Sequence, residues 1–223
     1  MNEKCWLKEH CNKIDCDRFC KKFYKVNFLY DMSLIPYNRR KHTNLYIDND
    51  GSDEREFETL SRIESNILDF VNNGDNLFLF SSNMGNGKTE WSLRLAERFI
   101  SKIWATSDLT CRVLFISVPR FLLELKDNIA NKSEYVEHIK KYVTTCDLVI
   151  WDDIATKLGT EFELSHLLSI IDTRVNNGKS NIYTSNVSGV ELSKALGDRL
   201  YSRIVNYSTY VLEFKGKDKR GIK

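Results

Sequence analysis

The sequence predicts an α/β fold built on a parallel five-stranded sheet, and two observations carry this prediction. Short apolar runs, typical of buried strands, alternate along the chain with segments whose apolar residues recur at helical spacing. One apolar run leads directly into a glycine-containing loop and a helix, the local order that a phosphate-binding loop requires. The five strands are expected at residues 77–80, 112–117, 148–153, 181–186 and 207–214.

The phosphate-binding loop is expected within residues 76–91, which read NLFLFSSNMGNGKTEW. Gly85 and Gly87 can adopt positive φ and lack a Cβ, so successive backbone N–H groups can surround an anion. The positive end of the following helix faces the same anion. Lys88 supplies a charge for the β- and γ-phosphates, and Thr89 supplies a hydroxyl ligand for Mg²⁺. The expected nucleotide-binding residues are Ser82, Asn83, Met84, Gly85, Asn86, Gly87, Lys88, Thr89 and Glu90.

Ser82 departs from the usual GxxxxGK[ST] pattern, because it stands where that pattern has its first glycine. This position shapes the entry to the turn more than the phosphate contact, so the match is weakened but kept. The alternative is a chance Gly-Lys-Thr before a core helix.

Polar side chains follow two later strands at the edge where ligands bind in open α/β sheets. The strand LVIWDD ends in Asp152, expected to hold Mg²⁺ directly or through water, and Asp153, expected to polarise the attacking water. Glu is usual at the second position, so the shorter Asp153 is a less secure base. Asn186, at the end of NIYTSN, is placed to touch the γ-phosphate or the lytic water. An acidic turn or a polar strand end without a catalytic role is the alternative for each.

Arg199 and Arg203 lie four residues apart in LGDRLYSRI and are expected to share a helix face. They form either a solvated basic face or a pair of arginines that reaches a neighbouring subunit's nucleotide. The expected catalytic residues are Lys88, Asp152, Asp153, Asn186, Arg199 and Arg203.

Four cysteines near the N-terminus suggest a metal site. Cys5, Cys11, Cys16 and Cys20 could close a tetrahedral zinc site in a segment too short to fold around a core of its own. Their spacing is not the common paired CxxC form. An iron–sulfur cluster and a set of free cysteines on a helix remain alternatives.

Composition restricts the function classes. The 223 residues are 42% hydrophobic and 29% charged, with a net charge of +2, so no global field favours nucleic acid. No apolar run is long enough to span a membrane, and the N-terminus lacks a signal-peptide core. A cytoplasmic location with reduced thiols is expected.

Composition shifts suggest four parts: a cysteine-rich, partner-docking domain at 1–30, a linker at 31–50, the phosphate-loop domain at 51–214, and a basic, mobile tail at 215–223. Asp53 and Glu56 predict a capping box at the start of one helix that ends at Gly74. Residues 34–37 are candidates for the wall of a base pocket, with plain linker packing as the alternative.

The segments SSNMGNGKT, LVIWDDI, NIYTSN and LGDRLYSRI, in this order, resemble the AAA+ P-loop NTPase core of DnaC/DnaI-type replicative helicase loaders. The resemblance covers about residues 50–214 and implies ATP and Mg²⁺ as cofactors and ATPase activity. It also implies self-assembly into an oligomer on single-stranded DNA and a hexameric helicase as partner. These loaders lack a full helical lid, as expected here, and an N-terminal metal-bound docking domain is similarly found in DnaI-like loaders. Small chains of this type are often encoded by phages.

Two other functions compete with helicase loading. One is a transposition-type ATPase adaptor, which shares this core; the other is a non-catalytic, nucleotide-gated module, suggested by Ser82 and Asp153. Candidate DNA contacts are Lys102, Trp104 and Arg120, each with a plain surface or core role as the alternative.

Overall fold

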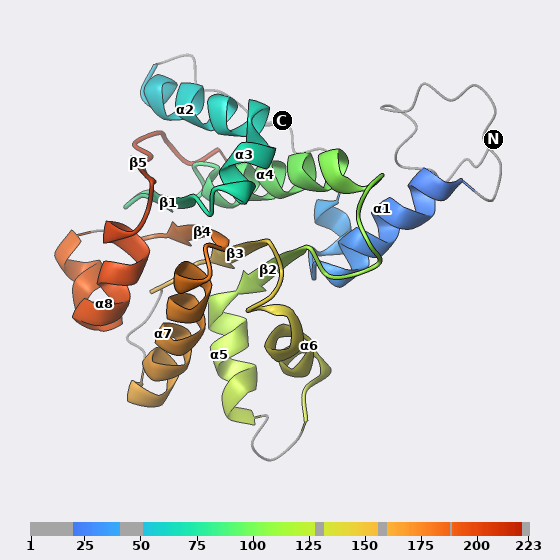
Figure 1. Cartoon of the computed structure of the whole chain (residues 1–223). Coiled ribbons are helices and arrows are strands. Elements are labelled where there is room, and N and C mark those ends of the chain that lie inside the picture. The colour runs from blue at the N-terminus through green and yellow to red at the C-terminus, as the bar shows by residue number, and fades with distance from the viewer. Residues whose placement is uncertain (1–19, 41–50, 128–131, 156–159, 188, 220–223) are drawn as a thin grey trace.

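The computed structural model describes residues 20–40, 51–127, 132–155, 160–187 and 189–219. Its centre is a parallel five-stranded sheet with strand order β2-β3-β4-β1-β5 (Figure 1). The strands are β1 (Asn76–Phe80), β2 (Val113–Ser117), β3 (Leu148–Asp152), β4 (Ser180–Ser185) and β5 (Tyr210–Glu213). The predicted α/β fold with five parallel strands is therefore confirmed.

Helices cover both faces of the sheet. One face packs against α1 (Lys21–Met32), α2 (Glu54–Ser65), α3 (Ile67–Asn72) and α4 (Lys88–Ile103). The other packs against α5 (Val118–Asp127), α6 (Glu134–Tyr142), α7 (Glu161–Asn176), α8 (Gly189–Tyr201) and the short π-helix η3 (Ser202–Asn206). Both faces are buried, which explains why β1 and β3 are nearly continuous apolar runs; the inner strand β4 (SNIYTS) is fully buried as well but carries buried polar side chains at both ends.

The strand order brings the predicted phosphate loop and the polar residues at the ends of β3 and β4 to the same end of the sheet. β1 lies between β4 and β5, and β3 lies beside β4, so the carboxyl ends of β1, β3 and β4 meet. The helix after β1 covers one face of the sheet, whereas the helices after β2 and β3 cover the other. Such a change of face leaves a crevice beyond the carboxyl ends of the strands, where ligands bind.

The N-terminal part of the described chain packs on this core. In α1, Val26, Leu29 and Tyr30 are buried, and Ile35 joins the same apolar cluster. The Ser33 carbonyl accepts a hydrogen bond from the backbone N–H of Phe115 in β2. Residues 21–40, divided above between a docking domain and a linker, therefore pack with the sheet and the helices of its core. A short 3₁₀ turn, η2 (Tyr37–Arg39), ends this segment.

Two local expectations around Asp53 are wrong. The single helix expected up to Gly74 is broken at Asn66 into α2 and α3. The Asp53 side chain makes no capping hydrogen bond, although Asp53 precedes α2. Its carboxylate instead accepts hydrogen bonds from the backbone N–H groups of Lys215 and Gly216. The basic tail, expected to be mobile, is thus held at its first residues by a distant acid.

Candidate nucleotide-binding site

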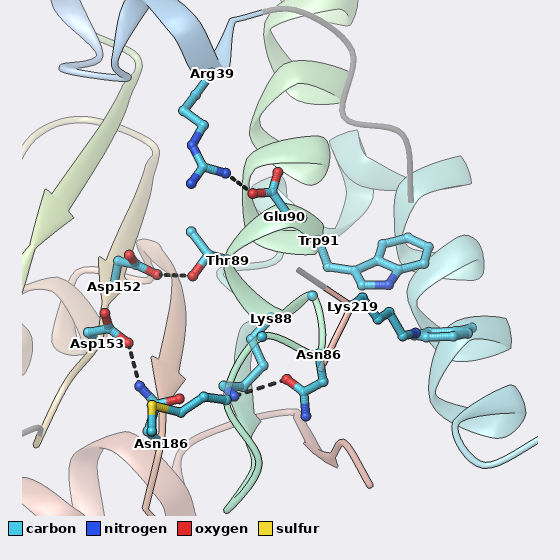
Figure 2. Close-up of a pocket in the computed structure, with 14 residues that line it drawn as sticks. Arg39, Asn86, Lys88, Thr89, Glu90, Trp91, Asp152, Asp153, Asn186 and Lys219 are labelled. Carbon is cyan, nitrogen blue, oxygen red and sulfur yellow. Dashed lines mark hydrogen bonds and ion pairs between the residues drawn. The ribbon is translucent and has the colours of Figure 1, made fainter. Parts of the chain in front are cut away.

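A cavity of about 530 Å³ opens at the carboxyl ends of β1, β3 and β4 (Figure 2). It brings together the loop between β1 and α4, the ends of β3 and β4, and three residues from elsewhere in the chain. The lining residues are 84–91, Asp152, Asp153, Asn186, Arg39, Phe57 and Lys219. Most of the expected nucleotide-binding and catalytic residues thus surround one cavity.

The loop takes the conformation that its glycines permit. Gly85 has φ 74° and Gly87 has φ 100°, both in the left-handed region. An added Cβ at Gly87 would meet nothing within 4 Å, so a side chain would not clash there. Glycine is favoured at this position by the positive φ alone. Gly87 immediately precedes α4, so the helix N-terminus faces the cavity.

Lys88 is the first residue of α4, directly after this loop, and is only 5% exposed. Its Nζ donates to the Asn86 side-chain oxygen at 3.1 Å and to the Asn83 carbonyl at 3.2 Å. Both acceptors are neutral oxygens of the loop itself, and they orient the ammonium toward the cavity that Lys88 lines. A positive charge at the N-terminus of α4 suits a bound anion.

Ser81 anchors the loop, although Ser82 was the serine that the sequence singled out. The buried Ser81 hydroxyl accepts hydrogen bonds from the Asn86 side chain at 2.6 Å and the Asn83 backbone N–H at 2.9 Å. It donates to the Phe214 carbonyl at 2.5 Å. Ser82 is exposed, and neither it nor Asn83 lines the cavity. No local pattern in the sequence distinguishes the two adjacent serines.

Asp152 and Thr89 form an oxygen-rich pair beside the loop. One oxygen of the Asp152 carboxylate accepts hydrogen bonds from the hydroxyls of Thr89 and Thr184, each at 2.8 Å. Burial, followed by the neighbouring negative charge of Asp153, raises the pKa of Asp152 above the ordinary aspartate value. A buried carboxylate and a hydroxyl in contact are ligands suited to Mg²⁺, so these two residues could hold the metal.

Asp153 is held in an unusual backbone conformation. Its φ of 58° lies in the left-handed region, which costs energy for a residue with a Cβ. Its N–H donates to the Thr184 hydroxyl at 2.9 Å, and its carboxylate accepts from the Asn186 side-chain amide at 2.8 Å. Both Asp153 and Asn186 line the cavity, so this pair could orient a water molecule against a bound phosphate.

Four residues of the cavity, Arg39, Phe57, Trp91 and Lys219, are not among the predicted site residues. Arg39 forms an ion pair with Glu90 at the start of α4 (Figure 2). The Phe57 ring lies 5.7 Å from the Trp91 ring, centroid to centroid, and 4.8 Å from the Lys219 Nζ. The segment 34–37 was considered for a base pocket, but the residue that reaches the cavity is Arg39. Within that segment Leu34 lines a different cavity and Tyr37 is 72% exposed.

Arg199 and Arg203 do not line the cavity around the phosphate loop. They lie beside a separate cavity of about 530 Å³, together with Asp172 and Asp198. Arg203 forms an ion pair with Asp172, and its guanidinium carbon lies 4.7 Å from the Tyr207 ring centroid; Arg199 is exposed. The two arginines were expected on one helix face; Arg199 lies in α8 after a non-helical residue, Gly197, and Arg203 lies in the π-helix η3, but both line this cavity.

The three candidate DNA contacts differ in their surroundings. Arg120 pairs with Glu124 and lies 4.0 Å from the centroid of the Tyr135 ring. Trp104 is partly buried against the core, whereas Lys102 is exposed at the end of α4. None of the helices in the described ranges is long and apolar enough to cross a membrane.

The cysteine-rich segment lies almost wholly outside the described residues. Of the four proposed ligands, only Cys20 is described; it is half-buried, immediately before α1. Cys5, Cys11 and Cys16 are outside. Among the residues that the structure describes, no group of three or more His, Cys, Asp or Glu side chains could hold a metal ion.

Comparison with known proteins places this site in a family. The chain is 23% identical over 174 residues to the replicative helicase loader DnaC of Escherichia coli (strain K12), covering 74% of this chain and 68% of that protein. A crystal structure of the DnaC helicase loader matches with a TM-score of 0.63 at 21% identity, covering 79% of this chain and 99% of that one. The replication initiator DnaA bound to AMPPCP and single-stranded DNA matches with a TM-score of 0.59 at 18% identity, covering 77% of this chain and 48% of that one.

These likenesses confirm the resemblance stated from the sequence. The model of the bacterial DnaA ATPase domain matches residues 60–208, about two thirds of the 223-residue chain. The matched range contains the phosphate loop, the two acids at the end of β3, Asn186 and the two arginines. This chain therefore belongs to the bacterial DnaA ATPase domain family.

Proposed function

We propose that this protein is an ATPase that places a hexameric replicative helicase on single-stranded DNA, hydrolysing ATP where copies of the chain meet. The observation that carries the proposal is the cavity itself. It combines left-handed loop glycines, a buried lysine at a helix N-terminus, a Thr89–Asp152 oxygen pair and the Asp153–Asn186 pair. The similarity to DnaC, a replicative helicase loader, supports helicase loading over the transposition adaptor.

Each residue of the cavity has a role in this proposal. Backbone N–H groups of residues 85–89 and the Lys88 ammonium bind the phosphates of ATP, and Thr89 and Asp152 hold Mg²⁺, which would neutralise charge on the β- and γ-phosphates. Asp153, oriented by Asn186, accepts a proton from the attacking water. Arg199 or Arg203 reaches the nucleotide of a neighbouring copy.

The N-terminal cysteines belong to the same proposal. Cys5, Cys11, Cys16 and Cys20 hold one Zn²⁺ and form the part that docks the helicase. Because α1 packs on the core from Lys21 onward, deletion of residues 1–19 is a cleaner test than a longer deletion. Protein purified without chelator should contain about one zinc per chain; well under one zinc or iron per chain would exclude the site.

A loading assay on closed circular single-stranded DNA tests the whole proposal, because a helicase ring must be opened to encircle DNA without ends. The host's replicative helicase should stay on the circle when the protein and ATP are both present. With the 1–19 deletion, AMPPCP should still bind but helicase should not be retained. If the protein hydrolyses ATP but the helicase is neither bound nor retained, the loader function is wrong and the transposition-type adaptor is favoured. If ATP is bound without single-turnover hydrolysis, the protein is a non-catalytic, nucleotide-gated module.

A further inference from the structure

Residues Phe214–Lys219, which we call the strap, follow β5 and lie along the phosphate loop. The Phe214 carbonyl accepts hydrogen bonds from Ser81 at 2.5 Å and Asn86 at 3.4 Å, both in the loop. At the other end of the strap, the Lys219 backbone N–H donates to the Gly85 carbonyl at 2.9 Å. The strap is thus fixed to the loop at both ends.

A buried acid fixes the middle of the strap. The Asp53 carboxylate is 2% exposed; it accepts from the N–H of Lys215 at 2.7 Å and from the N–H of Gly216 at 3.0 Å. The Asn83 side chain adds hydrogen bonds to the carbonyls of Lys215 and Gly216, at 3.1 and 3.4 Å. Hydrogen bonds to an ionised carboxylate are stronger than neutral ones, and here they order a segment that its composition alone would leave mobile.

This anchoring brings Lys219 into the cavity. Its side chain lies on the side opposite Asp152, Asp153 and Asn186, as Figure 2 shows. The Nζ lies 4.8 Å from the centroid of the Phe57 ring. Because the Lys219 backbone N–H donates to the Gly85 carbonyl, the side chain starts beside the phosphate loop, and a lysine stem is long and flexible enough to reach a phosphate bound there.

We propose that Lys219 is a nucleotide-binding residue whose ammonium contacts the phosphates of ATP, and that Asp53 positions it through the strap. This inference rests on the proposed function, since it assigns a further contact to the same ligand. Lys219 supplies a second positive charge in the same chain, from the side of the cavity away from the Mg²⁺ ligands. Lys88 and Lys219 then hold the phosphates from two directions.

Titration calorimetry of the full chain with AMPPCP and Mg²⁺ tests the inference. Lys219→Met removes the charge and keeps most of the stem, and should weaken binding by about tenfold at low salt, as expected for one lost charge contact. Lys217→Met is the matched control, because Lys217 is an exposed lysine of the same strap and its loss should change nothing. The difference between the two variants should shrink as salt is added, because salt screens an exposed charge contact.

A double-mutant cycle tests the role of Asp53. Asp53→Ala should weaken AMPPCP binding in the wild-type background but add little in the Lys219→Met background, since the strap acts through that lysine. Additive losses would overturn the positioning role of Asp53. Thermal unfolding of each variant shows whether the fold is retained, and Lys219→Met, which changes only a half-buried side chain, tests the contact even if Asp53→Ala is unstable.

The outcomes separate this inference from the proposed function. If wild type and Lys219→Met bind AMPPCP equally, the Lys219 contact is wrong and the ATPase proposal stands. A salt-independent loss in Lys219→Met would mean that the stem packs on Phe57 without contacting phosphate, which also overturns the inference. If the wild type binds no AMPPCP, both proposals fall.

Discussion

The cavity at the phosphate loop and the cavity beside α8 and η3 differ in which of the predicted site residues line them. In the first, Lys88, Thr89, Asp152, Asp153 and Asn186 come from three separate segments and line the same space. The second holds the arginine pair with two aspartates, and in the described part of the chain neither arginine lines the first cavity. Arg39 does line the first cavity, but it is paired with Glu90. We therefore propose that one chain binds ATP and Mg²⁺ at the first cavity and that another copy supplies Arg199 or Arg203 for hydrolysis.

The largest expected effect is at the first cavity. Lys88→Ala should abolish ATP hydrolysis and leave the fold intact, because Lys88 lines the cavity proposed to bind phosphate and its loss would remove charge stabilisation of the transition state. Turnover by the purified variant tests the loss of hydrolysis, and thermal unfolding tests whether the fold is retained. Arg98→Ala is the control, because it removes a positive charge from an exposed position of the same helix. Turnover at the wild-type rate in Lys88→Ala would contradict the assignment of the whole cavity.

The next effect concerns the second cavity. Arg199→Ala should lower turnover by roughly a thousandfold, at the strong end of arginine-finger effects, while ATP affinity changes little. Arg203→Ala should have a smaller effect, because Arg203 is already engaged by Asp172 and Tyr207 whereas Arg199 is exposed. Steady-state kinetics of both variants, with Lys194→Ala as an exposed control on α8, would show the order. If turnover is unchanged in both arginine variants at every protein concentration, the two arginines have no catalytic role and form only a solvated basic face.

Wild-type turnover per chain should also depend on assembly. It should rise with protein concentration and with single-stranded DNA, which gathers copies together. A rate per chain that stays constant across concentration would mean that the first cavity is sufficient by itself, and the contrast between the two cavities would lose its functional meaning.

The smallest expected effect is that of Asp152→Asn on the thermal stability of the protein without ligand. The pKa of Asp152 is raised in the folded chain by burial and by Asp153, so protonated Asp152 favours the folded state below its unfolded pKa. That contribution is lost as pH rises through the folded pKa, and at neutral pH the ionised group opposes folding. Asp152→Asn, which can still accept from Thr89 and Thr184, should raise the Tm at neutral pH by about 2–4 °C per kcal/mol relieved.

The Asp152→Asn comparison should be made without nucleotide or Mg²⁺, by thermal unfolding across pH. The Tm difference from wild type should disappear at pH values below the folded pKa, where Asp152 is protonated and neutral. A variant less stable than wild type at neutral pH would show that the two hydroxyl contacts outweigh the cost of burial. Its Mg²⁺-dependent turnover should be lost in either case, because a metal ligand is removed.

Features encoded by a local sequence pattern could be predicted from the sequence, whereas features that depend on contacts between distant residues could not. Buried parallel strands are apolar runs, and the phosphate loop needs glycines at fixed positions, so both could be read along the chain. Asp53 looks locally like a helix cap, but its partners, Lys215 and Gly216, lie more than 160 residues away and no short pattern announces them. The kink at Gly197 and the change from α8 to the π-helix η3 likewise went unpredicted, although Arg199 and Arg203 still line one cavity.

The most direct test of the central claim is to mix two inactive variants. Lys88→Ala cannot use its own cavity but presents an intact Arg199, whereas Arg199→Ala has an intact cavity and lacks the arginine. If copies complete each other's sites, the mixture should hydrolyse ATP well above the sum of the two proteins measured alone, on single-stranded DNA above all. A mixture that hydrolyses no more than that sum, although both variants assemble on the DNA, would contradict an arginine supplied from a second chain.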